Sequence, residues 1–240
     1  MDNNFAVLSP EEMSFYKRNG YLVLPRFFPE EKCEILLKIF REYADVTFRA
    51  LLNIERQALE AVELIENPKF IKVLEDLHGH KEMGYIGSQV LFKEVGSPYA
   101  QHAWNPHQDN AYIEAPYGTY VSAIISFADS DKENGGMYIY PGSHREDLLP
   151  YIPHPSFDPE INPGNLVQVP PQYECFDLCL KTGDLYIQHG NLIHGSYANY
   201  SSRSRPHWGI MCVVKGVKFN KGRNIPRFFT PFRRGELKYE

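Results

Sequence analysis

The strongest constraint on the fold is a series of short β-rich runs that begins after Gly84 and continues almost to the C-terminus. Glycine and proline separate these runs, as at Gly135-Gly136, Pro141-Gly142 and Thr182-Gly183. The strands that this pattern predicts are 85–92, 119–127, 137–140, 165–169, 175–180, 184–188, 192–194 and 207–214. Many short strands at close intervals are typical of an antiparallel barrel or double sheet of the jelly-roll type.

Before these strands the sequence is mainly helical. Ser9 suits the N-cap of a first helix, and Glu12 would close its capping box. A short strand is predicted at 21–24, and further helical segments are predicted after Pro29, at 54–65 and at 69–77. The sequence therefore predicts an α+β chain with a double-stranded β-helix, or cupin-like barrel. We expect one domain over 1–240, with mainly helical support in 1–83 outside a jelly-roll core in 84–235.

Composition narrows the class of protein. A chain of 240 residues with 43% hydrophobic and 14% aromatic residues can bury one substantial core. The N-terminal segment has no basic stretch followed by an apolar run, and no apolar run approaches the roughly 20 residues of a membrane-spanning helix. The four cysteines show no C-x-x-C spacing. These features predict a cytoplasmic protein without a membrane partner.

The charge is distributed unevenly, although the net charge is only −5. Residues 185–235 contain no Asp or Glu, but they contain nine basic residues: Arg203, Arg205, Lys215, Lys218, Lys221, Arg223, Arg227, Arg233 and Arg234. This run is either a solvated basic face or a region that attracts an anionic substrate. Because the whole chain is acidic and has no nucleic-acid recognition motif, we expect a small-molecule partner and not a nucleic acid. The sequence gives no oligomeric state.

Two candidate metal ligands lie in His107-Gln108-Asp109. On an extended strand, side chains two residues apart project to the same side, so this imidazole and this carboxylate could hold neighbouring positions on a metal ion. A third ligand is available near residue 190, where His189 and His194 compete. Residue types alone do not choose between these two histidines.

The order of several motifs resembles the phytanoyl-CoA dioxygenase (PhyH) family of non-haem Fe(II), 2-oxoglutarate-dependent oxygenases. The matching motifs are Gly20-Tyr21, His107-Gln108-Asp109 with Tyr112, Asn134-Gly135, Pro141-Gly142-Ser143-His144, Gly183-Asp184, His194-Gly195-Ser196, and Arg205 eleven residues after His194. Together they cover nearly the whole chain, and their combination is more specific than any single motif.

The resemblance implies that His107, Asp109 and His194 bind Fe(II). Two histidines and one carboxylate leave three positions open on the ion, which 2-oxoglutarate and O2 would take. Arg205, in preference to Arg203, would bind the far carboxylate of 2-oxoglutarate as a bidentate partner, and Ser196 would add a hydroxyl. We also expect the strands that carry His194 and Arg205 to pair as a hairpin.

The same resemblance suggests additional residues near the co-substrate. Gln89 lies eighteen residues before His107, and Lys93 shares its predicted strand face. Tyr112 follows the metal motif at a position where relatives carry an aromatic residue. Many relatives also have a tryptophan on the next strand, where this chain has Ile124 or Ile125. For Gln89, Lys93 and Tyr112, plain strand packing is an alternative to contact with the co-substrate.

The activity implied is hydroxylation, or another oxidation, of an unactivated C–H bond in a small metabolite, with release of succinate and CO2. Halogenating relatives lack the carboxylate ligand, so Asp109 favours hydroxylation. The alternative is a jelly-roll protein that binds a metal or another ligand without catalysis. Residues 145–173 contain seven prolines and little periodicity, which is typical of a long loop that covers a site. The substrate itself is not named by the sequence.

Overall fold

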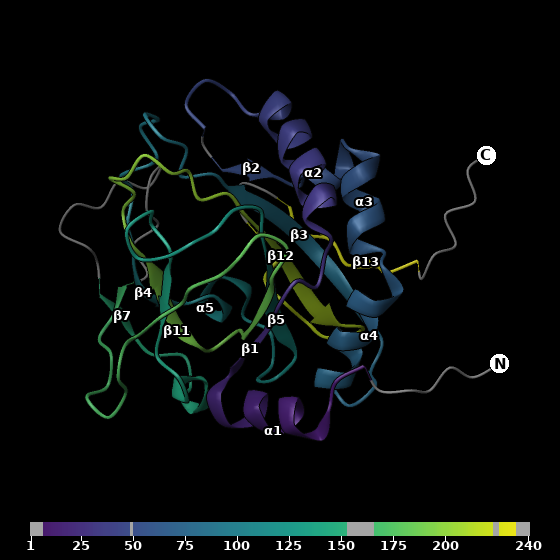
Figure 1. The fold of residues 1–240 in the computed structure, drawn as a ribbon. Helices are drawn as coiled ribbons and strands as arrows, with labels where there is room; N and C mark the ends of the chain where they lie inside the picture. The colour runs from purple at the N-terminus through teal and green to yellow at the C-terminus, as the bar shows by residue number, and fades with distance from the viewer. Residues whose placement is uncertain (1–6, 49, 153–165, 223–225, 234–240) are drawn as a thin grey trace.

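A computed structural model describes residues 7–48, 50–152, 166–222 and 226–233 (Figure 1). The helical elements are α1 (Pro10–Asn19), α2 (Glu30–Tyr43), η1 (Ile54–Arg56), α3 (Leu59–Ile65), α4 (Pro68–Leu77), α5 (Asn110–Ile113) and η2 (Ser143–Arg145). The strands are β1 (Tyr21–Leu24), β2 (Leu51–Leu52), β3 (Met83–Leu91), β4 (Trp104–Gln108), β5 (Tyr120–Ser126), β6 (Met137–Ile139), β7 (Tyr151–Ile152), β8 (Leu166–Val167), β9 (Phe176–Asp177), β10 (Leu185–His189), β11 (Ile193–Ser196), β12 (His207–Val214) and β13 (Thr230–Pro231).

Two antiparallel sheets form the centre of the molecule. The larger sheet has seven strands, of which six follow the order β1-β10-β5-β12-β3-β13. The seventh, β2, pairs with β3 at Gln89 and Val90, whereas β13 pairs with it at Gly84 and Tyr85. The smaller has the order β4-β11-β6-β9, and β7 pairs with β8 apart from both. This is the predicted jelly-roll arrangement with helices outside, although the described strands do not close into a barrel.

The helices pack on the outer face of the large sheet, where α2, α3 and α4 lie beside β3 in Figure 1. Phe40 of α2 contacts Trp208 of β12 at a ring-centroid distance of 5.2 Å and Phe127 at 5.5 Å. All three side chains are at most 3% exposed. Burying an aromatic side chain of this size contributes about 2–3 kcal/mol. This core covers and stabilises the outer face of the large sheet, so the opposite face remains available for a site.

Strand alternation divides the large sheet into two faces. Val121, Ala123 and Ile125 of β5 belong to the core beneath the helices. The intervening residues line a cavity between the two sheets: Tyr120, Ser122 and Ile124. The same alternation on β12 puts Trp208 into the core and His207 and Gly209 into the cavity wall. One face of each strand therefore stabilises the fold, and the other face builds the cavity.

Several predicted boundaries are confirmed, and others shift. Ser9 caps α1 in a capping box with Glu12, and Gly20 ends that helix with a φ of 78°. The continuous helix predicted over 54–65 is instead a 3-10 turn, η1, followed by α3. The strand predicted at 175–180 is reduced to the two residues of β9. The predicted loop 145–173 includes β7 and β8, and its part 153–165 lies outside the described residues.

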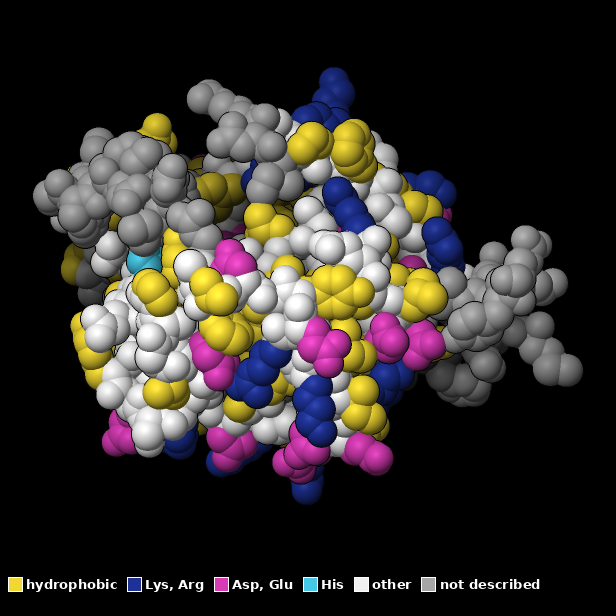
Figure 2. Space-filling model, turned by 90° about the horizontal axis from the view of Figure 1, so that it is seen from above, with side chains coloured by type: hydrophobic (Ala, Val, Ile, Leu, Met, Phe, Trp, Pro, Cys, Tyr) yellow, Lys and Arg dark blue, Asp and Glu magenta, His cyan; other side chains and the backbone are white. Residues whose placement is uncertain are grey.

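Basic and acidic side chains are interspersed on the face that Figure 2 shows, and hydrophobic side chains lie among them singly and in small groups. Three surface ion pairs illustrate this mixing: Arg203 with Asp131, Lys181 with Asp129, and Lys215 with Glu82. None of the described helices has the length and apolar content needed to cross a membrane.

Candidate active site

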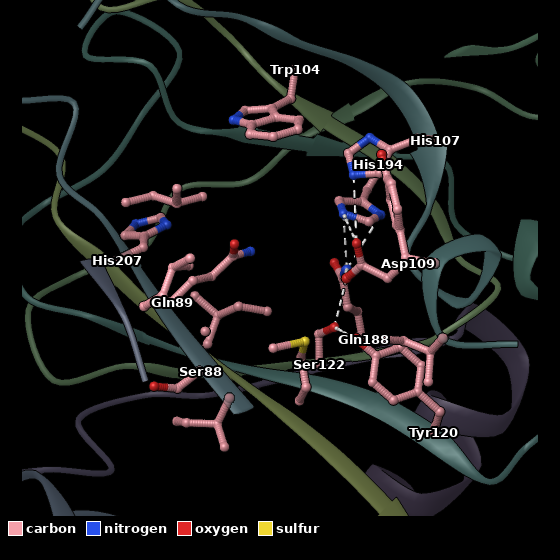
Figure 3. Close-up of a pocket in the computed structure, with 18 of the residues that line it drawn as sticks. Ser88, Gln89, Trp104, His107, Asp109, Tyr120, Ser122, Gln188, His194 and His207 are labelled. Carbon is pink, nitrogen blue, oxygen red and sulfur yellow. Dashed lines mark hydrogen bonds and ion pairs between the residues drawn. The ribbon is translucent and has the colours of Figure 1, made fainter. Parts of the chain in front are cut away.

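His107 and His194 are direct partners across the pairing of β4 with β11. Opposite residues in antiparallel strands have Cβ atoms about 5 Å apart, so both imidazoles enter the cavity side by side. Their ring centroids are 4.3 Å apart, and both side chains are buried. The sheet register therefore creates the two-histidine half of the site (Figure 3).

Asp109 reaches the histidines in a way that the sequence did not predict. Strand β4 ends at Gln108, and Asp109 has φ −58° and ψ −35°, the helical conformation that opens α5. The expectation that His107 and Asp109 share one face of an extended strand was therefore wrong. The turn into α5 brings the carboxylate back towards the imidazoles, with Oδ1 3.5 Å from Nε2 of both His107 and His194.

Each histidine is oriented by a backbone carbonyl. Nδ1 of His107 is 2.7 Å from the carbonyl oxygen of Asn105, and Nδ1 of His194 is 3.0 Å from that of Leu192. A carbonyl accepts only from a protonated nitrogen, so Nδ1 carries the hydrogen and Nε2 keeps its lone pair. The pKa of His194 is lowered to about 4, chiefly by burial and also by His107, against the raising effect of Asp109. The carbonyl contacts thus leave the Nε2 lone pair of each ring directed away from Nδ1, as metal ligation through Nε2 requires.

The second oxygen of Asp109 is held by two side chains of the large sheet. Ser122 donates to Oδ2 at 2.6 Å, and the amide nitrogen of Gln188 donates to it at 2.9 Å. Burial raises the pKa of the Asp109 carboxyl, but the neighbouring imidazoles of His194 and His107 and the bond from Ser122 lower it below the ordinary range. Asp109 is therefore a fixed carboxylate whose Oδ1 faces the imidazoles.

A further layer orients these two donors. The hydroxyl of Tyr120 lies 2.7 Å from that of Ser122, and the hydroxyl of Tyr186 donates to Gln188 at 2.7 Å. The Tyr186 bond occupies the amide oxygen of Gln188, which turns its nitrogen towards Asp109. Ser122 and Gln188 were not predicted from the sequence, because the prediction depended on histidines and on the spacing of motifs. Their only signal in the sequence is strand alternation, which places each of them on the cavity face of a predicted strand.

The three groups fit one metal ion. Among the described residues His107, Asp109 and His194 form a candidate metal cluster, with one ligand atom from each and all of these atoms within 4.8 Å of one another. Ligands bonded at about 2.1 Å to a common ion lie about 3.0–3.4 Å apart at ordinary coordination angles, which is close to the 3.5 Å measured here. Two imidazoles and one carboxylate are the ligand set of non-haem Fe(II) oxygenases.

The competing histidine, His189, lies outside this cluster. It follows Gln188 on β10, so alternation directs it away from the cavity. Its ring packs against Tyr117 at 4.8 Å and His144 at 5.3 Å, and its Nδ1 accepts a bond from the backbone of Asn191. Burial, together with His144 and His78, lowers its pKa to about 4. The structure therefore groups His194, and not His189, with the other two ligand candidates.

Arg205 lies at another part of the same cavity and is only 1% exposed. Its Nε donates to the carbonyl of Gly135 at 2.9 Å, and among the described residues no acidic side chain pairs with it. Arg203, by contrast, is on the surface and pairs with Asp131. The expected hairpin was wrong, because β11 belongs to the small sheet and β12 to the large one. Arg205 precedes β12 and reaches the cavity from the opposite sheet.

Lys93 lies behind Ser196. Its Nζ donates to the Ser196 hydroxyl at 2.9 Å and also to the carbonyl of Tyr197, and the side chain is buried but does not line the cavity. Because Ser196 accepts this bond, its own hydroxyl hydrogen is free to be donated into the cavity, which Ser196 does line. Lys93 is thus placed to orient Ser196.

This end of the cavity is rich in nitrogen and poor in negative charge. Burial lowers the pKa of Arg205 to about 9. Burial, and then the charge of Arg205, lowers the pKa of Lys93 to about 5. The pKa of His207 falls well below its usual value for the same reasons, and neither of its ring nitrogens has a hydrogen-bond partner in the described part of the chain. Such a cluster is suited to an anion.

The remaining predicted residues contribute to the wall of the cavity, which has a volume of about 300 Å³. Gln89 and Tyr112 both line it, and Figure 3 shows Gln89 beside His207, across the cavity from Asp109. Ile124 occupies the wall where many relatives carry tryptophan, whereas Ile125 points into the core. Trp104 was not predicted from the sequence; it lines the cavity at the top of Figure 3, and its ring centroid is 5.9 Å from that of His107.

Comparison with known proteins agrees with this geometry. The family model for phytanoyl-CoA dioxygenase (PhyH) matches residues 16–207. A phytanoyl-CoA dioxygenase of Arabidopsis thaliana is 25% identical over 280 residues, which cover 93% of this chain and 95% of that protein. The peroxisomal phytanoyl-CoA dioxygenase of Mus musculus is 22% identical over 260 residues, covering 95% of this chain and 75% of that protein.

Solved structures share the fold. EctD from S. alaskensis in its apoform superposes with a TM-score of 0.73 at 19% identity, covering 97% of this chain and 86% of that one. The epimerase SnoN, in complex with Fe3+, alpha ketoglutarate and nogalamycin RO, gives a TM-score of 0.72 at 18% identity and covers 92% and 94%. With a family match over most of its length, this chain belongs to the phytanoyl-CoA dioxygenase (PhyH) family and is an Fe(II)- and 2-oxoglutarate-dependent oxygenase.

Proposed function

We propose that His107, Asp109 and His194 hold the Fe(II) of this enzyme, and that it hydroxylates an unactivated C–H bond of a small, anionic metabolite. The observation that carries the proposal is the position of Asp109 Oδ1, which lies 3.5 Å from Nε2 of both histidines while Oδ2 is occupied elsewhere. One oxygen thus remains for the metal, and three coordination positions stay open for co-substrate and O2.

Arg205 and Ser196 are proposed to bind the far carboxylate of 2-oxoglutarate. Arg205 is a buried cation without an acidic partner in the described residues, so a carboxylate in the cavity would supply the missing charge. Ser196 adds a hydroxyl that Lys93 holds in place. Gln89 and Tyr112 are proposed to contact the co-substrate from the wall, because both line the same cavity. A jelly-roll protein that only bound a metal would not need this clamp.

When bound, Fe(II) with 2-oxoglutarate and O2 supplies the oxidising power, with succinate and CO2 as products. The protein residues position the reactants and exclude water. Gln188 and Ser122 hold Asp109 so that its charge and direction stay constant. Trp104 and Ile124 give the cavity apolar walls. Asp109 supplies a carboxylate ligand that halogenating relatives lack, so the proposed outcome is hydroxylation.

The proposal also includes the domain organisation, the cellular location and the kind of partner. The whole chain is proposed to act as one catalytic domain, since a single core joins residues of α2, α4, β5 and β12. The absence of a nucleic-acid partner is proposed from the sequence pI of about 6.0 and from the mixed charges in Figure 2. A cytoplasmic location is proposed because the four cysteines are free thiols, as in a reducing compartment.

An anaerobic titration tests the proposal. Adding Fe(II) and then 2-oxoglutarate to the protein should give a weak visible charge-transfer band with one equivalent of each. Asp109→Ala should bind Fe(II) more weakly and, when O2 and substrate are admitted, should lose the coupled succinate production. Arg205→Met should weaken 2-oxoglutarate binding at least tenfold, since a buried charged hydrogen bond contributes about 1.5–3 kcal/mol. The matched control is Arg203→Met, which removes a surface arginine two residues away. An unchanged affinity for Fe(II) together with full coupled succinate production in Asp109→Ala would refute the ligand assignment.

A further inference from the structure

Arg227 is a second arginine of the cavity wall, and it lies at the end away from Arg205. It is half-buried and precedes β13, which pairs with β3 at Tyr85 and Gly84. The Arg205 end lies at the other end of β3, where Leu91 pairs with His207. The two arginines therefore enter the cavity from opposite ends of the same strand.

The candidate iron ligands lie between these two ends. On the floor of the cavity Met211 of β12 pairs with Ser122, the residue that holds Asp109. Met211 is four residues, or about 13 Å of strand, beyond His207. Tyr120 lies two positions further along β5 from Ser122, and Figure 3 places it away from His207. A co-substrate that extends from the iron to Arg205 leaves the Tyr120 end for another molecule.

The hydrogen bonds of Arg227 leave its charge uncompensated. Its Nη1 donates to two neutral backbone carbonyls, that of Tyr112 at 3.0 Å and that of Asn220 at 3.3 Å. The edge of the guanidinium formed by Nε and Nη2 has no hydrogen-bond partner in the described part of the chain. That edge is a bidentate donor for a carboxylate or a phosphate. Asp109, whose oxygens are already engaged at the ligand cluster, is the one acidic side chain among the described residues that line this cavity.

The charge of Arg227 also acts on its neighbours inside the cavity. Burial and Asp109 raise the pKa of the Tyr120 phenol, while the bond with Ser122 and the positive charge of Arg227 oppose that rise. Between Arg227 and the ligand cluster the lining is largely apolar, with Ile86, Ile113 and Met211. A cation beyond an apolar stretch matches a ligand with an anionic head and a hydrocarbon body.

We propose that Arg227 binds the anionic head of the substrate, a carboxylate or a phosphate, and so fixes which C–H bond faces the iron. This inference rests on the proposed function for the iron and co-substrate positions. It makes the substrate class a small amphipathic acid, with its apolar segment along Ile86, Ile113 and Met211. The cavity of about 300 Å³ is at the lower limit for ligand pockets and also receives 2-oxoglutarate, so the part of the substrate that enters is short.

The competing explanation is that Arg227 only closes the short helix α5 by binding the Tyr112 carbonyl. Two substitutions separate these roles. Arg227→Gln keeps an N–H donor for the carbonyl but removes the charge, and Arg227→Lys keeps a charge but loses the bidentate edge. The control is Lys218→Met, which removes an exposed cation of the same basic segment.

The test is calorimetric binding to the protein loaded with Fe(II) and 2-oxoglutarate without O2. The probes are butanoate, hexanoate and octanoate, each with its primary amide, and the alkyl phosphates of the same chain lengths. The unsubstituted protein and Lys218→Met should bind at least one acid series at least tenfold more tightly than the amide of the same chain length, a difference of about 1.4 kcal/mol. Arg227→Gln should lose this preference, and Arg227→Lys should retain part of it. Whichever acid series binds more tightly identifies the head group.

Three outcomes overturn the assignment. The amides bind as tightly as both acid series, or neither acid series binds at all. In the third outcome the preference for an acid persists in Arg227→Gln. Failure of the proposed function is distinguishable, because the unsubstituted protein would then not bind 2-oxoglutarate with Fe(II) in the first step. A protein that binds the co-substrate but shows no acid preference refutes only the role of Arg227.

Discussion

Replacing Lys93 by Met should make the metal-free protein more stable, by an amount that depends on pH. Burial, together with the charge of Arg205, lowers the pKa of Lys93 from 10.5 to about 5. Between these values the amine is neutral in the folded protein and charged in the unfolded chain, so folding releases a proton. The unfolded state binds more protons, and the free energy of unfolding of the unsubstituted protein therefore rises with pH across this window.

The destabilisation caused by Lys93 at a given pH follows from the difference between that pH and 10.5, the ordinary pKa of lysine. At pH 7 that difference is about 3.5 pH units, which corresponds to about 5 kcal/mol, and at pH 9 it corresponds to about 2 kcal/mol. Met cannot donate to Ser196 or to the carbonyl of Tyr197, and the two lost hydrogen bonds cost about 1 kcal/mol each. Lys93→Met should thus be about 3 kcal/mol more stable at pH 7 and nearly equal in stability at pH 9.

Urea unfolding at pH 7, 8 and 9, at constant ionic strength and without metal or 2-oxoglutarate, measures this difference. The change between pH 7 and pH 9, about 3 kcal/mol, does not depend on the cost of the two lost hydrogen bonds. The control is Lys181→Met. Lys181 is exposed and pairs with Asp129, which raises its pKa, so it stays charged in both states over this range. A difference between the unsubstituted protein and Lys93→Met that stays constant from pH 7 to pH 9 would show that folded Lys93 is charged.

Three further substitutions test the metal site and the core. Ser122→Ala removes one of two donors to Asp109 Oδ2 and should weaken Fe(II) binding about 10- to 100-fold in a metal titration, whereas unchanged affinity would make that bond irrelevant. Gly195→Ala would place a methyl group 2.3 Å from the Tyr138 hydroxyl and 2.4 Å from the Trp104 carbonyl; we expect a loss of about 1–3 kcal/mol on denaturation and weaker metal binding. Phe40→Ala empties the contact with Trp208 and should cost about 3–5 kcal/mol without changing the affinity for Fe(II).

The sequence predicted the ligand triad through motifs, but the geometry of the triad depends on contacts that motifs do not contain. His107 and His194 are 87 positions apart in the sequence and meet because β4 pairs with β11 in one register. Asp109 reaches the same point through the turn into α5 and not through strand alternation. A two-residue spacing fits both conformations. The motif could therefore identify the residues but not the backbone that brings them together.

The wrong hairpin has a comparable cause. Residues 197–206 connect β11 to β12, and a connection of this length often joins neighbouring antiparallel strands. Here the connection crosses from the small sheet to the large one. Hydrophobic alternation cannot reveal this crossing, since each strand has one inward face in either topology. The missed residues Ser122 and Gln188 follow from the same limit, because their contact with Asp109 depends on how the two sheets face each other.

The arrangement of charge in the cavity links stability to activity. Burying Arg205 and Lys93 without an acidic partner among the described residues destabilises the empty protein, and a fold selected for stability alone would replace them with apolar side chains. A ligand that binds only the folded state raises the free energy of unfolding, by an amount that grows with the logarithm of its concentration above Kd. For a dicarboxylate such as 2-oxoglutarate, the same buried arginine and the amine beside it that weaken the empty fold provide donors for binding. The pH-dependent destabilisation by Lys93 is thus a property of the active site that can be measured before any substrate is known.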